Sequence, residues 1–163
     1  MFRELRRKRQ ELPLQESIDI LMKGTSGVLA LSGDEGYPYA VPISYVYRDS
    51  KLYFHGAKSG HKIDAVKRQE KASFCVIAQD EVIPEKYTTD YRSVIVFGRI
   101  RILEDETEIK EAVEALAIKY HPDGDEAGRQ SEIDRFWETL CMMEMSVEHI
   151  CGKEGLELLR ARQ

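Results

Sequence analysis

The sequence predicts a small antiparallel β-barrel, closed or nearly closed, of the mainly β (α+β) class with peripheral helices. Six segments are rich in β-branched and aromatic residues, and turn signals separate most of them. Helical spacing of apolar residues is confined to a few short segments between these runs. Six strands joined largely by turns do not suit a parallel, doubly wound sheet, so the antiparallel barrel is the better prediction.

The expected strands follow from the runs of β-forming residues. The second strand contains Pro38 and Pro42, which cannot donate to a β-ladder, so we expect one of its sides to be unpaired or bulged. Gly98 interrupts the fifth and longest strand, and residues 79–90 are expected to form a loop. The six strands are Ser26–Ser32, Tyr37–Tyr47, Lys51–His55, Ala72–Ala78, Tyr91–Leu103 and Met143–Glu148.

Four segments have the spacing of amphipathic helices. A single domain over 1–163 accounts for the length, with a basic N-terminal arm at 1–13 and a helical insertion at 105–140. The expected helices are Gln15–Lys23, about 60–69, about 105–120 and a last one near 131–140.

Composition narrows the class of protein. Hydrophobic residues make up 42% of the chain and charged residues 33%, which is typical of a soluble globular protein. No apolar run approaches the ~20 residues that span a bilayer, and the basic N-terminus has no apolar run behind it to make a secretory signal. Three cysteines without CxxC spacing predict neither a disulfide framework nor a zinc site. A cytoplasmic protein without membrane contacts is therefore expected.

The net charge of −5 is unevenly spread along the chain. Positive residues crowd the N-terminal arm, where Arg3, Arg6, Arg7, Lys8 and Arg9 face a single Glu4. Such an arm can bind nucleic acid, or it can be a solvated segment whose aliphatic stems pack on the body of the protein. The acidic remainder of the chain favours the second interpretation, so no nucleic-acid partner is expected.

The strand around Tyr91–Phe97 is apolar on both faces. Ser93, Ile95 and Phe97 alternate with Val94 and Val96. A barrel strand with one buried face should not have this pattern. Either the helices of 105–140 cover its outer face, or a second subunit does.

A strand-to-helix corner with the sequence FHGAKSGHK, residues 54–62, can hold an anion. Unpaired amides and the dipole at a helix N-terminus favour a negative group, and Gly60 allows close approach of the backbone. Lys62 would oppose the dipole unless an anion lies there, and Ser59 and His61 can donate hydrogen bonds to the same anion. A polar helix entry with solvated lysines is the alternative.

The four histidines lack the spacing of a metal site. His55 is either a half-buried barrel residue bonded to the main chain or a titratable group at the reactive edge of a cofactor. His121 precedes Pro122 in an expected loop and should be exposed, and the partners of His149 cannot be predicted.

Several motifs extend through nearly the whole chain: RRK near the N-terminus, GVLAL at 27–31, YPYAVPISYVY at 37–47, LYFHGAKSGHKIDAVKR at 52–68, SFCV at 73–76 and YRSVIVFGRIRIL at 91–103. Their combination resembles the pyridoxamine 5'-phosphate oxidase-like FMN-binding split barrels, and among them the nitroimidazole-resistance-type flavoproteins. The resemblance implies a six-stranded FMN-binding split β-barrel that forms a homodimer. It also implies FMN between the subunits, with the phosphate at the strand-to-helix corner.

The resemblance implies a set of cofactor-binding residues. The phosphate would meet Ser59, Gly60, His61 and Lys62. From the neighbouring subunit, Arg92, Ser93 and Val94 would approach the ring or the phosphate. The flavin ring and ribityl chain would lie along Ala40, Val41, Pro42, Ile43 and Ser44 and beside His55, Gly56 and Ala57.

Two departures from the family pattern refine the expected activity. Where the vitamin oxidases have serine and arginine before the lysine, this chain has Gly60 and His61, so we expect phosphate affinity to be weaker or more dependent on pH. The substrate-binding arginine and histidine of the oxidases have no match in the C-terminal GKEGLELLRARQ. A reductase-like flavoprotein that passes electrons to a small acceptor is the better fit, with His55 as the catalytic candidate that orients or protonates the acceptor.

Two alternatives remain open. A non-catalytic flavin-binding or sensing protein would have the same barrel and corner without a productive substrate pocket. A haem-binding split barrel would use His55 or His149 as an axial ligand.

Overall fold

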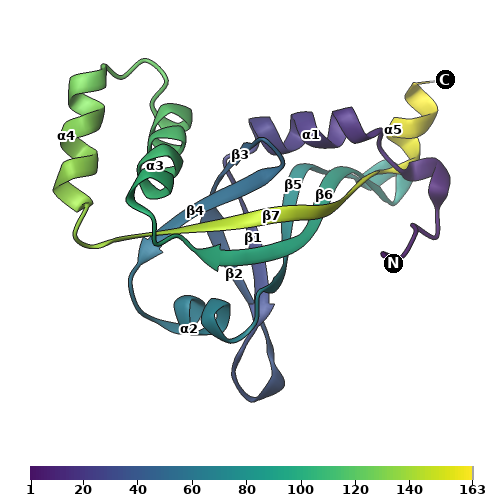
Figure 1. Ribbon diagram of the computed structural model, residues 1–163. Coiled ribbons are helices and arrows are strands. Elements are labelled where there is room, and N and C mark those ends of the chain that lie inside the picture. Colours follow the sequence, from purple (N-terminus) through teal and green to yellow (C-terminus); the bar gives the residue numbers. More distant parts are fainter. Residues whose placement is uncertain (163) are drawn as a thin grey trace.

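Seven antiparallel strands form one strongly curved sheet in the computed structural model, which describes residues 1–162 (Figure 1). The order across the sheet is β2-β1-β5-β6-β7-β4-β3. The antiparallel barrel class with peripheral helices is thus confirmed. The strands are β1 (Ser26–Ser32), β2 (Pro38–Ser44), β3 (Val46–Arg48), β4 (Lys51–Ala57), β5 (Lys71–Ile83), β6 (Thr88–Ile102) and β7 (Leu140–Glu154).

The strand number differs from the six expected, because the segment 37–47 breaks at Tyr45 into β2 and β3. The Tyr45 side chain is buried, and its hydroxyl donates to the carbonyl of Leu21 at 2.8 Å. Its backbone N–H donates to the hydroxyl of Tyr120 at 3.2 Å instead of to a neighbouring strand. Tertiary hydrogen bonds that a local pattern cannot reveal therefore interrupt the ladder.

The prolines of the second strand lie where they cost no ladder hydrogen bond. Pro42 pairs with Val28 of β1, and β2 is an edge strand with β1 as its one partner in the described sheet. The expectation of an unpaired side at Pro42 is confirmed.

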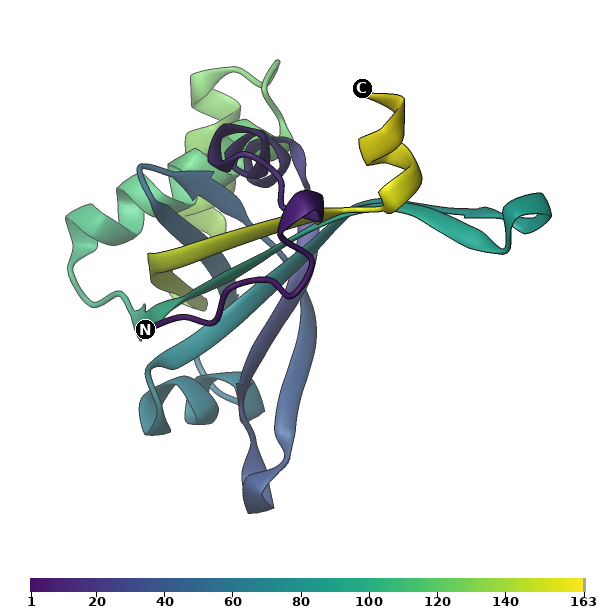
Figure 2. The same cartoon turned by 90° about the vertical axis from the view of Figure 1, so that its right-hand side faces the viewer.

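Residues 79–90, which were expected to form a loop, instead lengthen the hairpin of β5 and β6. The ladder continues from Gln79–Arg92 to Ile83–Thr88, and a short 3-10 turn at Pro84–Lys86 closes it. This two-stranded ribbon projects well beyond the barrel (Figure 2). Because both of its faces meet solvent, its residues need not alternate between apolar and polar, and the strand signal is lost.

The interruption at Gly98 is a bulge and not a strand end. Phe97 pairs with His149 while Gly98 pairs with Val147, so β7 carries one extra residue there. A Cβ atom at position 98 would collide with the carbonyl oxygen of Ser146, which explains the need for glycine.

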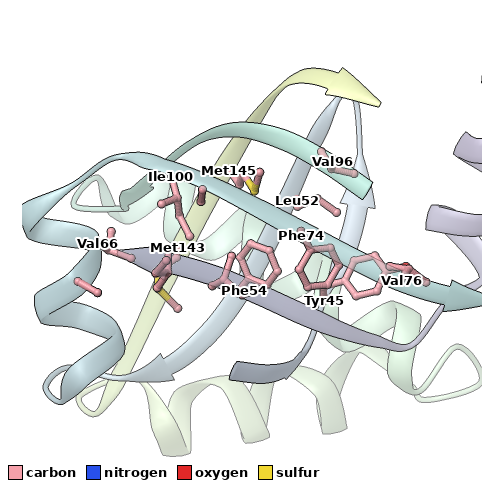
Figure 3. Packing of buried hydrophobic residues seen from close by; sticks show 14 of the residues in the cluster. Tyr45, Leu52, Phe54, Val66, Phe74, Val76, Val96, Ile100, Met143 and Met145 are labelled. Atoms are coloured by element: carbon pink, nitrogen blue, oxygen red, sulfur yellow. The ribbon is translucent and has the colours of Figure 1, made fainter. Parts of the chain in front are cut away.

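Apolar side chains from the inner faces of the strands fill the barrel (Figure 3). The ring of Phe74 packs edge-on against Tyr45 and Phe54, with ring centroids 4.8 and 5.1 Å apart. Met143 and Met145 of β7 are fully buried beside them. Burial of this one contiguous cluster is the main favourable contribution to the stability of the barrel.

The helices surround the barrel at its ends and along one side (Figure 1). Apolar residues of α1 (Leu14–Lys23) and α2 (His61–Arg68) join the core at opposite ends. The pair α3 (Glu106–Tyr120) and α4 (Glu126–Phe136) stands beside β3 and β4, and α5 (Leu156–Ala161) follows β7. The last helix of the pair begins earlier than expected because the Asp125 carboxylate accepts from the Gly128 amide at 2.6 Å and caps it. None of the helices within 1–162 has the length and apolar character to cross a bilayer.

Candidate functional site

The corner between β4 and α2 presents unpaired backbone donors. β4 ends at Ala57 and α2 begins at His61, with Gly60 as its N-cap. Gly60 has φ 115° and ψ 173°, a conformation that essentially only glycine adopts. No side chain among residues 1–162 caps this helix. Its first amides therefore face outward at the positive end of the helix dipole, where an anion is favoured.

Lys62 lies across the end of β4. A Cβ atom built on Gly56 would be 3.2 Å from the Lys62 Nζ atom and 3.3 Å from its Cε atom, so the absence of a side chain at Gly56 makes room for the lysine. Burial raises the pKa of the Cys141 thiol beneath, and the charges of Lys58, Lys62 and Lys67 oppose that rise. Three lysine charges thus act on the same corner.

The surroundings of His55 favour the neutral form of its imidazole. Burial lowers the pKa of its imidazole, and the nearby charge of Lys62 lowers it further. No described residue forms a hydrogen bond that shifts this pKa, so the alternative of a histidine bonded to the main chain is not what residues 1–162 show. A neutral imidazole can donate one N–H and accept at its other nitrogen.

The His55 side chain faces a hollow of about 690 Å³ between the barrel and the α3–α4 pair. Ser44, Gly56 and Ala57 contribute to the barrel side of this hollow. The helical side is largely apolar, with the polar groups of His121, Arg129 and Glu132 among its lining. Its apolar residues include Val113, Leu116, Ala117, Tyr120, Ile133 and Phe136. We call this space the helical hollow. Its size is that of a small-molecule site.

The outer face of β2, β1, β5 and β6 carries no charged side chain across its middle. Paired residues in neighbouring strands share a face, so the register places successive rows of side chains beside one another. Each residue of these rows is small, apolar or uncharged. The rows are Ala40–Ala30–Ser73–Phe97, Pro42–Val28–Cys75–Ile95 and, at their end, Ser44–Ser26 with Ile77–Ser93. We call this surface the uncharged face.

The structure divides the residues expected along the flavin into three groups. Ser44, His55, Gly56 and Ala57 line the helical hollow. The side chains of Ala40, Pro42 and Ser93 belong to the uncharged face. Those of Val41, Ile43 and Val94 pack in the core, so only their backbone is available to a ligand.

Two expected phosphate or ring contacts have partners within the chain. The His61 ring stacks on Tyr39 at 4.0 Å between centroids, and its Nε2 atom lies 3.6 Å from a carboxylate oxygen of Asp34. Arg92 Nε donates to the buried carboxylate of Glu154 at 3.3 Å. Both side chains are thus engaged within the chain, whereas Lys62, with the charge of Lys58 nearby, lies at the corner.

The α3–α4 pair does not cover the outer face of the Ser93–Phe97 segment. Instead it packs beside β3 and β4, and the exposed fractions of Ile95 and Phe97 are 38% and 36%. Phe2 of the N-terminal arm stacks on His149 with ring centroids 4.7 Å apart, and its ring is tilted against that of Phe97 at 5.6 Å. Of the two alternatives for covering this face, coverage by the helices is therefore wrong, and the arm covers one edge of it.

Sequence reasoning missed the helical wall of the hollow. The sequence predicts a helix over about 105–120, but its apolar spacing does not show that Val113, Leu116, Ala117 and Tyr120 meet a space beside His55. The contribution of α4 had no comparable signal, because Ile133 is its one buried residue.

A curved antiparallel barrel with an open helix N-terminus at its corner, beside a hollow and an uncharged outer face, defines the class of split barrels. The sequence model described as pyridoxamine 5'-phosphate oxidase matches residues 13–151 of this chain. The chain belongs to this family of flavin-binding, pyridoxamine 5'-phosphate oxidase-related split barrels. Among curated proteins, none matches the chain significantly.

Solved structures share the fold at low sequence identity. A conserved hypothetical protein from Mycobacterium tuberculosis superposes with a TM-score of 0.80 at 15% identity, over 95% of this chain and 92% of the other. A candidate 5-nitroimidazole antibiotic resistance protein from Bacteroides thetaiotaomicron has a TM-score of 0.75 at 19% identity, covering 88% and 86%. An FAD and heme binding protein from Mycobacterium smegmatis has a TM-score of 0.73 at 19% identity, covering 94% and 80%. At these identities the likeness establishes the fold alone.

Proposed function

We propose that this chain is an FMN-dependent oxidoreductase of the nitroimidazole-resistance type, which passes electrons from the flavin to a small acceptor. The observation that carries the proposal is the position of Lys62. It lies over Gly56, beside the uncapped start of α2, and its charge reaches His55 in the helical hollow. The proposed phosphate site at the start of α2 would thus lie next to the helical hollow, where the acceptor would react.

The residues of the chain would hold the cofactor in defined ways. The amides at the start of α2 and the Lys62 ammonium group would bind the phosphate, and Gly60 would let its oxygens approach the backbone. The side chains of Ala40 and Pro42 would offer an uncharged surface to the ring. The bound flavin would supply the electron-transfer chemistry. His55, neutral and exposed to the hollow, would donate a hydrogen bond to the acceptor.

FMN is proposed in preference to FAD because Lys62 and the α2 amides form a compact site suited to one terminal phosphate. The similar protein from Mycobacterium smegmatis is described as an FAD and heme binding protein. The experiment that identifies the cofactor must therefore distinguish FMN from FAD and from haem. Of the two histidines considered for haem, His55 faces the hollow, whereas His149 is stacked against Phe2.

A homodimer is proposed as the functional unit. The uncharged face is suited to an isologous interface, and two-fold dimers are the commonest assembly of soluble proteins. Ser93 lies on this face, so a partner subunit would bring it toward the flavin of the first. Arg92 would reach that flavin only by leaving its contact with Glu154. The dimer would also cover Ile95 and Phe97.

The absorption spectrum of the isolated protein tests the proposal. We expect a flavin spectrum, and we expect the flavin released from the protein to be FMN. We also expect the protein to reduce a nitroaromatic acceptor once its flavin has been reduced. His55→Ala should lower turnover while flavin content stays close to normal. Flavin without any turnover would favour a sensing protein, and a haem Soret band without a flavin spectrum would refute the flavin assignment.

A further inference from the structure

The helical hollow has a composition that selects for uncharged ligands. Its walls from α3 and α4 are mostly apolar, and two of their aromatic residues remain partly exposed: Tyr120 at 43% and Phe136 at 50%. Exposed aromatic surface inside a concave site is stabilised when an apolar molecule covers it. Single exposed apolar residues are ordinary, but here they converge on one space.

We propose that the helical hollow binds an uncharged, apolar ring compound that carries a carbonyl oxygen, of the size of one or two fused rings. The proposal rests on the proposed function, because the occupant would be the electron acceptor of the same site. It assigns acceptor selection to α3 and α4, which lie outside the strand-to-helix corner that would hold the flavin phosphate.

Besides His55 and Tyr120, the titratable groups that line the hollow are Arg129, Glu132 and His121. The arginine and the glutamate have partners, since a carboxylate oxygen of Glu132 lies 3.6 Å from Arg135. Arg129 approaches Glu114 at 3.7 Å and donates to the Gly124 carbonyl at 3.3 Å. The hydroxyl of Tyr120 donates to the Thr25 carbonyl and accepts from the Tyr45 amide. A ligand carboxylate or phosphate would therefore lose its hydration at a wall where Arg129 is already paired and the Glu132 carboxylate is of the same sign. Uncharged ligands avoid that cost.

His55 supplies the polar contact that orients such a ligand. Its neutral imidazole faces the hollow from the barrel side, opposite the apolar helices. An N–H donor at one wall and apolar surface at the other match a flat ring with one carbonyl acceptor. The ring would cover apolar surface while its oxygen accepts from the imidazole.

Equilibrium binding of 2,3-dimethyl-1,4-naphthoquinone to the flavin-loaded protein tests this assignment. The two methyl groups block addition of cysteine thiols, and oxidised flavin prevents turnover. Ala117→Phe fills the hollow and Phe136→Ala removes part of its wall. Ile118→Ala is the matched control, since Ile118 is 44% exposed on the same α3 helix and does not line the hollow. Flavin content and circular dichroism of each variant are measured in parallel.

We expect Ala117→Phe to weaken quinone binding at least about tenfold and Phe136→Ala several-fold, with flavin content and fold unchanged, while Ile118→Ala has no effect. The carboxylate analogue 3-methyl-1,4-naphthoquinone-2-carboxylate should bind wild type more weakly than the neutral quinone. Equal quinone binding in all variants would overturn the inference, as would loss of flavin in Ala117→Phe, which would place the flavin ring itself in the hollow. Wild type that binds flavin but no quinone would refute the inference alone. Quinone binding without any flavin would refute the proposed function instead.

Discussion

Lys62 is the residue on which the candidate site depends most. A lysine in the first turn of a helix opposes the dipole by about 0.3–1 kcal/mol. A charge-assisted hydrogen bond to a phosphate is worth about 1.5–3 kcal/mol, so the position is favourable when an anion is bound and unfavourable without one. The absence of a side chain at Gly56 leaves room for the lysine chain, as the proposed phosphate site requires.

Lys62→Ala should therefore weaken FMN binding by about 1.5–3 kcal/mol, or roughly 10- to 150-fold in Kd, without lowering the melting temperature of the apo protein. Fluorescence titration and a thermal melt measure the two effects. Lys67→Ala, one turn further along α2, is the control and should change FMN affinity much less. Equal losses in both variants would mean that only the general positive field matters.

His55 makes stability depend on pH. Its folded-state pKa lies below the unfolded value of about 6.5, because burial and Lys62 both disfavour the charged form. The unfolded chain then binds more protons than the folded chain as pH falls below 6.5, so stability decreases toward acid. Urea unfolding at pH 7.5 and 5.5 should show a smaller decrease for His55→Gln than for wild type. A parallel loss in both proteins would contradict the assignment.

At the scale of secondary structure, the corner between β4 and α2 contains two glycines, Gly56 and Gly60, that are needed for different reasons. Gly60 is required by backbone conformation, with nothing within 4 Å of an added Cβ atom, whereas a Cβ atom at Gly56 would press on the flexible end of Lys62. We therefore expect substitution of Gly60 to affect folding and substitution of Gly56 to affect ligand binding.

Gly60→Ala should lower stability by about 1–3 kcal/mol, because alanine is strained at φ 115°. Gly56→Ala should leave stability nearly unchanged and weaken FMN binding, since the new methyl group displaces the flexible end of Lys62. Chemical unfolding and flavin titration of both variants give the comparison. The reverse pattern, with Gly56→Ala unstable and Gly60→Ala unable to bind, would show that the roles are exchanged.

Several elements could be predicted because their signals are local. The helix at α2, the edge position of Pro42 and the polar corner all follow from residue types at fixed spacing. Others depend on distant partners. The break at Tyr45 arises from hydrogen bonds to Leu21 and Tyr120. β7 extends to Glu154 although its ends do not alternate, because buried Glu144 and Glu154 are paired with Lys51 and Arg92 and interrupt the apolar pattern.

For the whole molecule, the uncharged face is the feature that a single chain leaves unexplained. It spans β2, β1, β5 and β6, and it carries residues expected to meet the flavin from both subunits. If one cofactor bridges two chains, cofactor binding and dimerisation are linked by mass action. The sequence indicated this face through Ser93–Phe97, but the rows that join β6 to β2 depend on a register that only the fold reveals.

Ile95→Lys should abolish the dimer and lower flavin content together, because a charge would be buried without a partner at the proposed interface. Ile118→Lys, at a similarly exposed position on α3, should change neither. Analytical ultracentrifugation with and without FMN measures the assembly. A wild-type monomer with flavin fully bound, or an Ile95→Lys monomer that keeps its flavin, would refute the shared site.

Titration of the apo protein with FMN and with riboflavin tests the central claim most directly, because the two ligands share the ring and differ by the phosphate. With a phosphate site at the start of α2, FMN should bind at least about tenfold more tightly than riboflavin, and Lys62→Ala should remove most of that difference. Equal affinity of wild type for FMN and riboflavin would contradict the phosphate site at the corner of β4 and α2.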